Sequence, residues 1–248
     1  MGFKGSSAYE EQDFLENYLK RRSRKDSPNN AIEGPAIEFL LGTVKGADIL
    51  DLGCGDGNYG KELLDRGASS YTGVEGSAAM VKLASSRIDS SKGTVVHSSM
   101  EAFQFPVNRY DIVLSRMALH YIEDLERLFG SISQTMRSDG KFVFSVQHPL
   151  TTSSFASKTG GDKRGNWLVD DYFQQGERQE PWIGKTIVKY HRSIESYFKA
   201  LMSADFVVEA LQEGEPKLEN FVDSGEFERR KRIPIVLIFS CRKAGCKQ

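Results

Sequence analysis

The chain has 248 residues, of which 39% are hydrophobic and 27% are charged. This composition is ordinary for a globular protein, and it excludes collagen-like, low-complexity and wholly disordered chains. The 33 Lys and Arg residues nearly balance the 34 Asp and Glu residues, so the net charge is -1. Such a chain has no general positive field that would attract nucleic acid or anionic lipid.

The sequence predicts a cytoplasmic protein. The first ten residues contain no apolar segment of the signal-peptide kind, and the apolar run at 235–239 is far shorter than the roughly 20 residues that a membrane-spanning helix needs. The three cysteines, Cys54, Cys241 and Cys246, form no CxxC pair, which fits a reducing compartment and offers no metal-binding spacing. We therefore expect no membrane partner and no metal.

The first predicted elements are helices, followed by an alternation of strands and helices. Apolar residues at helical spacing predict helices over 7–22 and 36–41, separated by a polar stretch at 23–30. Short segments with Val, Ile, Leu, Phe or Tyr at their centres then predict strands. These strands lie at 47–52, 70–75, 93–97, 110–115 and 141–146. The helices between them lie at 59–66, 77–88 and 122–136, the last followed by a turn at 138–140.

The alternation stops after Pro149. Residues 150–192 show few regular patterns and contain both tryptophans, whereas a helix is predicted over 193–204. Two more strands, at 206–211 and 234–240, are expected to pair antiparallel at the end of the sheet.

Alternating strands and helices form parallel sheets with right-handed crossovers, and such sheets bind ligands at the carboxyl ends of their strands. The prediction is a doubly wound, Rossmann-like α/β fold with a seven-stranded, mostly parallel sheet. Its parts are an N-terminal helical cap at 1–42, a main domain at 43–149 and 193–248, and an inserted segment at 150–192.

The strongest motif is the heptapeptide DLGCGDG at 51–57, directly after a predicted strand and before a predicted helix. Glycines at alternate positions let a ligand approach the main chain and the helix N-terminus. An NAD-binding oxidoreductase would have a further glycine where Asn58 stands, and the carboxylates of Asp51 and Asp56 would repel a pyrophosphate. They suit a ligand with a cationic amino group instead. Glu75, at the end of the next strand, can accept two hydrogen bonds from ribose, which indicates a nucleoside.

These residues resemble the class I S-adenosylmethionine-dependent methyltransferases, through 49–57 and Glu75. The stretches 109–124 and 140–146 look like the fourth- and fifth-strand motifs of that family. Within it, the chain is similar to a group of small-molecule methyltransferases, of methyltransferase type 11, with a Trp/Tyr-rich insert after strand five. The resemblance implies S-adenosylmethionine as the cofactor and S-adenosylhomocysteine as its product.

The resemblance also implies a set of cofactor-binding residues. The glycine loop would hold the methionine end and Glu75 the ribose, while Ser99 stands where the family usually has an acidic residue for the adenine amino group. The full set is Asp51, Gly53, Cys54, Gly55, Gly57, Glu75, Gly76, Ser77, Met80, Ser99, Met100, Glu101, Ser115, Leu119 and His120. For Cys54 we expect a packing role and no reactive thiol.

The methyl acceptor is expected near the insert. His148 leaves the fifth strand at its carboxyl end, so it is the first candidate for a general base, with His191 and Tyr190 behind it. The aromatic insert is predicted to form a lid over the substrate. The N-terminal helix closes the other side or forms a dimer contact. The predicted substrate contacts are Tyr9, Tyr18, Trp167, Asp170, Tyr172 and Trp182.

Two basic clusters, at 20–25 and 229–232, could together contact RNA phosphates, but charge runs are usually solvated faces, and this is how we interpret them. The sequence thus predicts methyl transfer, by in-line displacement, to an O or N atom of a small, aromatic or heterocyclic acceptor. The alternatives are an RNA or protein methyltransferase and a non-catalytic S-adenosylmethionine-binding module. The chain is expected to be a monomer or homodimer without a nucleic-acid partner.

Overall fold

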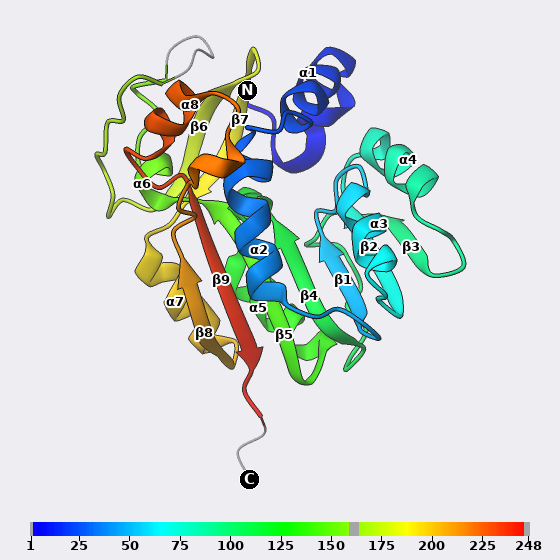
Figure 1. The fold of residues 1–248 in the computed structure, drawn as a ribbon. Coiled ribbons are helices and arrows are strands. Elements are labelled where there is room, and N and C mark those ends of the chain that lie inside the picture. The colour runs from blue at the N-terminus through cyan, green and yellow to red at the C-terminus, as the bar shows by residue number, and fades with distance from the viewer. Residues whose placement is uncertain (1, 159–163, 246–248) are drawn as a thin grey trace.

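A seven-stranded sheet runs through the centre of the computed structural model, which describes residues 2–158 and 164–245 (Figure 1). Its strands are β1 (Asp48–Leu52), β2 (Ser70–Glu75), β3 (Gly93–His97), β4 (Tyr110–Arg116), β5 (Met136–Gln147), β8 (Phe206–Gln212) and β9 (Val236–Lys243). Their order is β3-β2-β1-β4-β5-β9-β8. The five strands from β3 to β5 are parallel, and β9 runs antiparallel to β5 and β8. The predicted Rossmann-like fold, with its antiparallel pair at the end of the sheet, is confirmed.

Helices cover both faces of the sheet because successive strand residues point to opposite sides. The main helices are α2 (Gly34–Leu41), α3 (Asn58–Asp65), α4 (Ala78–Arg87), α5 (Leu125–Thr135) and α7 (Ile194–Ser203). Ile49 of β1 packs in one apolar cluster with residues of α2 and α3, whereas the next residue, Leu50, packs in a second cluster with α5 and α7. Strands buried on both faces read as continuous apolar runs, which is why the sequence locates them well.

The predicted N-terminal helix is two helices in the structure. A 3-10 helix, η1 (Gly5–Glu10), and α1 (Gln12–Arg22) are separated by Glu11, whose backbone is extended. The break turns the Glu10 carboxylate toward the start of α4, where it accepts a hydrogen bond of 2.7 Å from the Ala78 amide. The π-helix η2 (Asn29–Glu33) and α2 pack on the sheet through apolar residues, among them Ile32 and Ile37.

The segment 150–192 has more regular structure than its sequence suggests. Its first residues belong to a short helix, α6 (Pro149–Thr152). It also contains an antiparallel hairpin of β6 (Gly176–Trp182) and β7 (Lys185–His191). The hairpin turn has positive φ at Ile183 and Gly184. A β-branched residue seldom adopts this conformation, so the usual Asn-Gly or Asp-Gly turn signal is missing.

The hairpin packs against the N-terminal residues and forms hydrogen bonds with them. Phe3 pairs with β7 through two backbone hydrogen bonds of 2.8 Å, to Thr186 and Val188. The Trp182 ring packs edge-on against Phe14 and Tyr18 of α1, at centroid distances of 5.5 and 5.8 Å. Figure 1 shows α1 and this hairpin together above the carboxyl ends of the strands.

Two further differences concern β5 and the connection between β8 and β9. β5 begins at Met136, and the predicted turn at 138–140 is an excursion within that strand, where Asp139 has a φ of 61°. Between β8 and β9 the chain forms a 3-10 helix, η4 (Leu218–Asn220), and α8 (Ser224–Arg230), neither of which we predicted.

Candidate active site

The glycine loop after β1 has the backbone that only glycine adopts easily. Gly53, Gly55 and Gly57 have φ values of 78°, 58° and 74°. A Cβ on Gly53 would lie 2.7 Å from the Ala118 Cβ, and one on Gly57 would lie 2.8 Å from the Ala84 Cα of α4. A Cβ on Gly55 would meet nothing within 4 Å. The outer two glycines therefore allow close packing, whereas the central one leaves space for a ligand.

Asp51 brings a buried carboxylate to this space. Its Oδ2 accepts a hydrogen bond of 2.8 Å from the Tyr71 hydroxyl, whereas its Oδ1 is buried without a partner among the described residues. Burial raises the pKa of the carboxyl to about 6, against the lowering effect of the Tyr71 hydrogen bond. An unpaired buried oxygen of this kind could receive a cationic or hydrogen-bond-donating ligand group.

Glu75 closes the other side of the loop. One carboxylate oxygen accepts from the Gly55 amide at 3.0 Å, and the other accepts from the Ser77 amide at 2.8 Å. Burial raises the pKa of Glu75, and these two amides oppose the rise. Each oxygen keeps lone-pair capacity for a second donor, so the side chain could also bind a pair of hydroxyl groups.

Both carboxylates line a cavity of about 880 Å³ at the carboxyl ends of β1, β2 and β4, the first cavity. It brings together most of the predicted cofactor contacts, namely Asp51, Gly53, Cys54, Gly55, Glu75, Gly76, Met80, Ser99, Met100 and Glu101. Tyr9 and Tyr18 also line it, from η1 and α1. Its described lining carries six acidic and four basic side chains, so it suits a ligand with positive charge.

A second cavity, of about 530 Å³, adjoins the first. Tyr18, Arg22, Asn29 and Met117 line both. Trp167 and Trp182 line only the second cavity, together with side chains from the two basic clusters of the sequence. Part of each cluster therefore lines this cavity, and residues about 200 positions apart in the sequence meet around it.

The comparisons with known proteins agree with this geometry. A family model described as a methyltransferase domain matches residues 50–144. An uncharacterised protein of Haemophilus influenzae is 30% identical over 96% of this chain and 97% of its own length. The structure of an S-adenosylmethionine-dependent methyltransferase from Mesorhizobium loti is 29% identical and superposes with a TM-score of 0.77, over 90% of this chain and 99% of that one. A proposed S-adenosylmethionine-dependent methyltransferase from Listeria monocytogenes is 28% identical, also with a TM-score of 0.77, over 85% of this chain and 96% of that one.

The chain is a class I S-adenosylmethionine-dependent methyltransferase. Its cofactor is S-adenosylmethionine, and the family leaves the oxidoreductase alternative without support.

Five predicted cofactor residues of the methyltransferase do not line the first cavity. Gly57 packs against α4, and Ser77 caps the same helix by accepting from the Met80 amide at 3.2 Å. Ser115 donates to the Leu52 carbonyl at 2.8 Å and so joins β4 to β1 beneath the loop. Leu119 lies in the apolar core. These four residues shape the site from behind.

The fifth, His120, stands behind its neighbour Tyr121, which lines the first cavity in its place. The two rings lie 4.4 Å apart between centroids, and the His120 Nδ1 accepts from the Gln147 amide at 3.4 Å. Burial holds the pKa of His120 well below its ordinary value. It is a neutral packing residue.

The three predicted general-base candidates of the methyltransferase line neither cavity. His148 is buried, its Nδ1 accepts from the Leu150 amide at 3.2 Å, and its Nε2 donates to Glu213 at 3.0 Å. His191 bonds Thr152 and the Tyr172 carbonyl through its two ring nitrogens, at 2.8 and 2.9 Å. With both nitrogens engaged, neither imidazole is free to take a proton from a substrate.

Tyr190, the third candidate, donates its hydroxyl proton to Glu123 at 2.9 Å. Burial and this carboxylate raise the pKa of Tyr190 to about 12. The structure thus argues against all three residues as bases, because position at a strand end does not determine where a side chain points.

Some of the predicted substrate contacts line the cavities and others do not. Tyr9, Tyr18, Trp167 and Trp182 line the cavities, whereas Asp170 and Tyr172 do not. Asp170 is exposed, and its carboxylate accepts from the amide of Asp171. Tyr172 lies against His191 with centroids 5.7 Å apart.

Sequence reasoning missed a buried ion pair at the wall of the first cavity. Arg116, the last residue of β4, contacts both Glu33 oxygens, and one of them, Oε1, also accepts from the Ser145 hydroxyl at 2.8 Å. The guanidinium stacks over the Tyr59 ring at 4.1 Å. The sequence signal that could have identified Arg116 is its position at the carboxyl end of a predicted parallel strand. The pair ties η2 to β4 and β5.

The remaining predictions concern cysteines, metals and membranes. Cys54 packs against Gly73, and burial raises the pKa of its thiol, as a packing role requires. Cys241 is buried, and Cys246 lies outside the described residues. Within 2–158 and 164–245, no group of His, Cys, Asp or Glu side chains is placed to hold a metal ion, and no helix is long and apolar enough to cross a membrane.

Asp51→Asn should stabilise the ligand-free methyltransferase at neutral pH. The carboxyl binds a proton at a pKa of about 6 when folded and near its ordinary 3.8 when unfolded, so its contribution to the free energy of unfolding falls as pH rises through this range. The variant should exceed wild type by roughly 2–3 kcal/mol near pH 7, and by much less near pH 4. Urea unfolding across this range measures the difference. A difference in the free energy of unfolding that does not change with pH would contradict the raised pKa of Asp51.

Proposed function

We propose that this methyltransferase transfers the methyl group of S-adenosylmethionine to an O or N atom of a small, aromatic or heterocyclic acceptor. The observation that carries the proposal is the Asp51 Oδ1, without a partner among the described residues, in an acidic cavity that adjoins a second, aromatic-lined one. S-adenosylmethionine is cationic and carries an amino group, a ribose and an adenine, and the first cavity offers a group for each.

The fit can be stated residue by residue. Asp51 would receive the amino group, and the open space at Gly55 would admit the methionine chain. Glu75 would accept from the ribose hydroxyls. The adenine would lie by Met80, Ser99, Met100 and Glu101. Asp56 contributes less, because its carboxylate is paired with Arg87 at 2.8 Å.

When bound, S-adenosylmethionine supplies a methyl group already activated by a sulfonium. The work left to the protein is to hold the nucleophile about 3–3.5 Å from that methyl and in line with it. Tyr9 and Tyr18 support this role from above the strands. Burial raises the pKa of both phenols, so at neutral pH they hold their protons and orient the acceptor by hydrogen bonding.

A closed site favours a small acceptor over RNA or protein. We propose that the described parts of the predicted insert, 150–158 and 164–192, form a lid with α1, supported by the contacts of Trp182 with Phe14 and Tyr18. Phe3, joined to β7, fastens the lid from the N-terminal side. A lid of large aromatic side chains excludes water and buries much of a small ligand.

Glu75→Gln should weaken S-adenosylhomocysteine binding about 10- to 100-fold, since it replaces a charged acceptor by a neutral one in a buried site. Isothermal titration measures this, with the exposed Glu126→Gln as the matched control. Equal affinity for wild type and Glu75→Gln would contradict the ribose role.

Methyl-labelled S-adenosylmethionine, incubated with enzyme and a cell extract, should label the metabolite fraction. The Glu75→Gln variant should lose most of this label at limiting cofactor. Label in the RNA or protein fraction would instead support those acceptors, and absence of label in every fraction, with normal S-adenosylhomocysteine binding, would favour a binding module.

A further inference from the structure

The two cavities differ in charge, and the second one is strongly basic. Its described lining carries seven basic side chains against two acidic ones, Glu180 and Glu226. Besides Arg22 and Arg164, the basic residues are Arg21, Arg24, Lys158, Arg229 and Arg230. They come from three separate parts of the chain, the end of α1, the insert and α8.

The two acidic residues are already engaged. Glu180 contacts both Lys158 and the buried Lys189. Glu226 contacts Arg229 and Arg230, which are 18% and 14% exposed at their side chains. The pKa of Arg230 falls to about 10 through burial and through its neighbours Arg229 and Arg24, despite Glu226. Positive charge in this cavity therefore exceeds what its carboxylates balance.

Two guanidinium groups have donors to spare. Arg22 Nη1 and Arg164 Nη2 are buried, and neither has a hydrogen-bond partner among the described residues. An unpaired buried donor costs about 1–3 kcal/mol, more when charged, so such groups usually have a ligand or water as partner. Gln147 Oε1, also at this cavity, is a further buried atom without a partner in the described segments. Its amide can present either an acceptor or a donor to a ligand.

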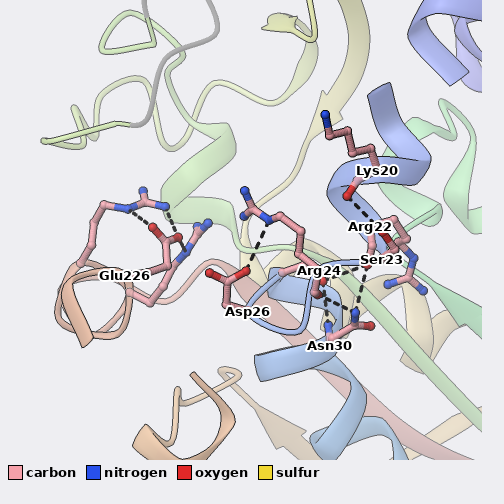
Figure 2. Close-up of polar contacts among 10 residues, drawn as sticks. Lys20, Arg22, Ser23, Arg24, Asp26, Asn30 and Glu226 are labelled. Carbon is pink, nitrogen blue, oxygen red and sulfur yellow. Dashed lines mark hydrogen bonds and ion pairs between the residues drawn. The ribbon is translucent and has the colours of Figure 1, made fainter. Parts of the chain in front are cut away.

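The segment from Arg22, at the end of α1, to Asn30 is held in place by its own hydrogen bonds. Asn30 Nδ2 donates to the carbonyls of Arg22 and Arg24, at 3.0 and 2.8 Å, and the Ser27 hydroxyl donates to the Arg22 carbonyl at 3.2 Å. Arg24 pairs with Asp26 at 3.3 Å. Figure 2 shows this loop beside the Glu226 cluster of α8. A rigid cluster of this kind loses little entropy when it binds.

We propose that the methyl acceptor carries an anionic group, a carboxylate or a phosphate, that binds Arg22 and Arg164 in the second cavity. The inference rests on the proposed function, because it places the acceptor beside the donor site. Arginine suits such a group, since its planar fork matches carboxylate and phosphate oxygens.

The shared wall of the cavities then sets the geometry of the reaction. An acceptor anchored in the second cavity passes Tyr18 and Met117 to reach the first. Met117 has a φ of 52°, unusual for a methionine, and its amide donates to the Ser145 carbonyl and hydroxyl at 3.0 and 2.9 Å. Strained backbone held this firmly is typical of functional positions.

The test uses the full chain saturated with S-adenosylhomocysteine and titrated with malonate and with inorganic phosphate. Malonamide is the neutral match for malonate, and chloride balances ionic strength. Both tryptophans of the chain line the second cavity, so their emission reports its occupancy directly. Malonate or phosphate should produce a saturable change that malonamide does not, and the tighter of the two identifies the anionic group.

Arg164→Gln should weaken anion binding about 10- to 100-fold while leaving S-adenosylhomocysteine affinity within about twofold. Arg22→Gln should weaken anion binding similarly, and the exposed Arg127→Gln should not change it. Arg164→Lys keeps the positive charge but loses the planar guanidinium, so its anion affinity should lie between those of wild type and Arg164→Gln. If Arg164→Gln does not fold, Arg164→Lys and Arg22→Gln still test the site.

Equal binding of malonate and malonamide, no response to either anion, or the same anion affinity in the arginine variants would overturn the proposal. A single-stranded RNA oligonucleotide that binds through Arg164 when neither small anion does would also overturn it. If S-adenosylhomocysteine binds but no anion does, only this inference fails. If S-adenosylhomocysteine itself does not bind, the proposed function fails.

Discussion

Five parallel strands end at one edge of the sheet, and both cavities depend on that edge. Parallel pairing brings the residues that follow β1, β2, β3 and β4 together although they are far apart in sequence. The glycine loop, Glu75, Ser99 and Met117 meet there for this reason. The buried pair of Arg116 and Glu33 then fixes η2 at the same edge, which positions the loop of Arg22 just before it. Removing one partner of such a pair leaves the other charge buried and unpaired, at a cost of about 3–5 kcal/mol, so Arg116 and Glu33 depend on each other at the wall of the first cavity.

Charge divides the site into two halves with different tasks. Carboxylates dominate the first cavity, and guanidinium groups dominate the second. One oxygen of Asp51 and one donor each of Arg22 and Arg164 have no partner in the part of the chain that the structure describes. A cationic methyl donor would bind in the acidic first cavity and an anionic acceptor in the basic second one. Their reacting atoms would meet at the residues that line both cavities. No histidine of the described chain lines either cavity, and in this proposal the alignment of two oppositely charged ligands supplies much of the catalysis.

The sequence located the first cavity better than the second, for physical reasons. Buried parallel strands and a glycine loop leave strong local patterns, so the donor side followed from short segments such as 51–57. The hairpin of β6 and β7 lacks an ordinary turn signal at Ile183, and the basic cavity joins clusters about 200 residues apart, which no local pattern reveals. His148 illustrates a different limit. The sequence predicts its place at the end of β5, but its side chain caps α6 and donates to Glu213.

A crystal structure of the methyltransferase with S-adenosylhomocysteine bound tests the central assignment most directly, because it locates the sulfur atom relative to the shared wall. We predict that the amino group lies within hydrogen-bond distance of Asp51 Oδ1 and the ribose against Glu75, with the sulfur facing Tyr18 and Met117. A sulfur atom that faces away from the second cavity would contradict the division of the site into donor and acceptor halves.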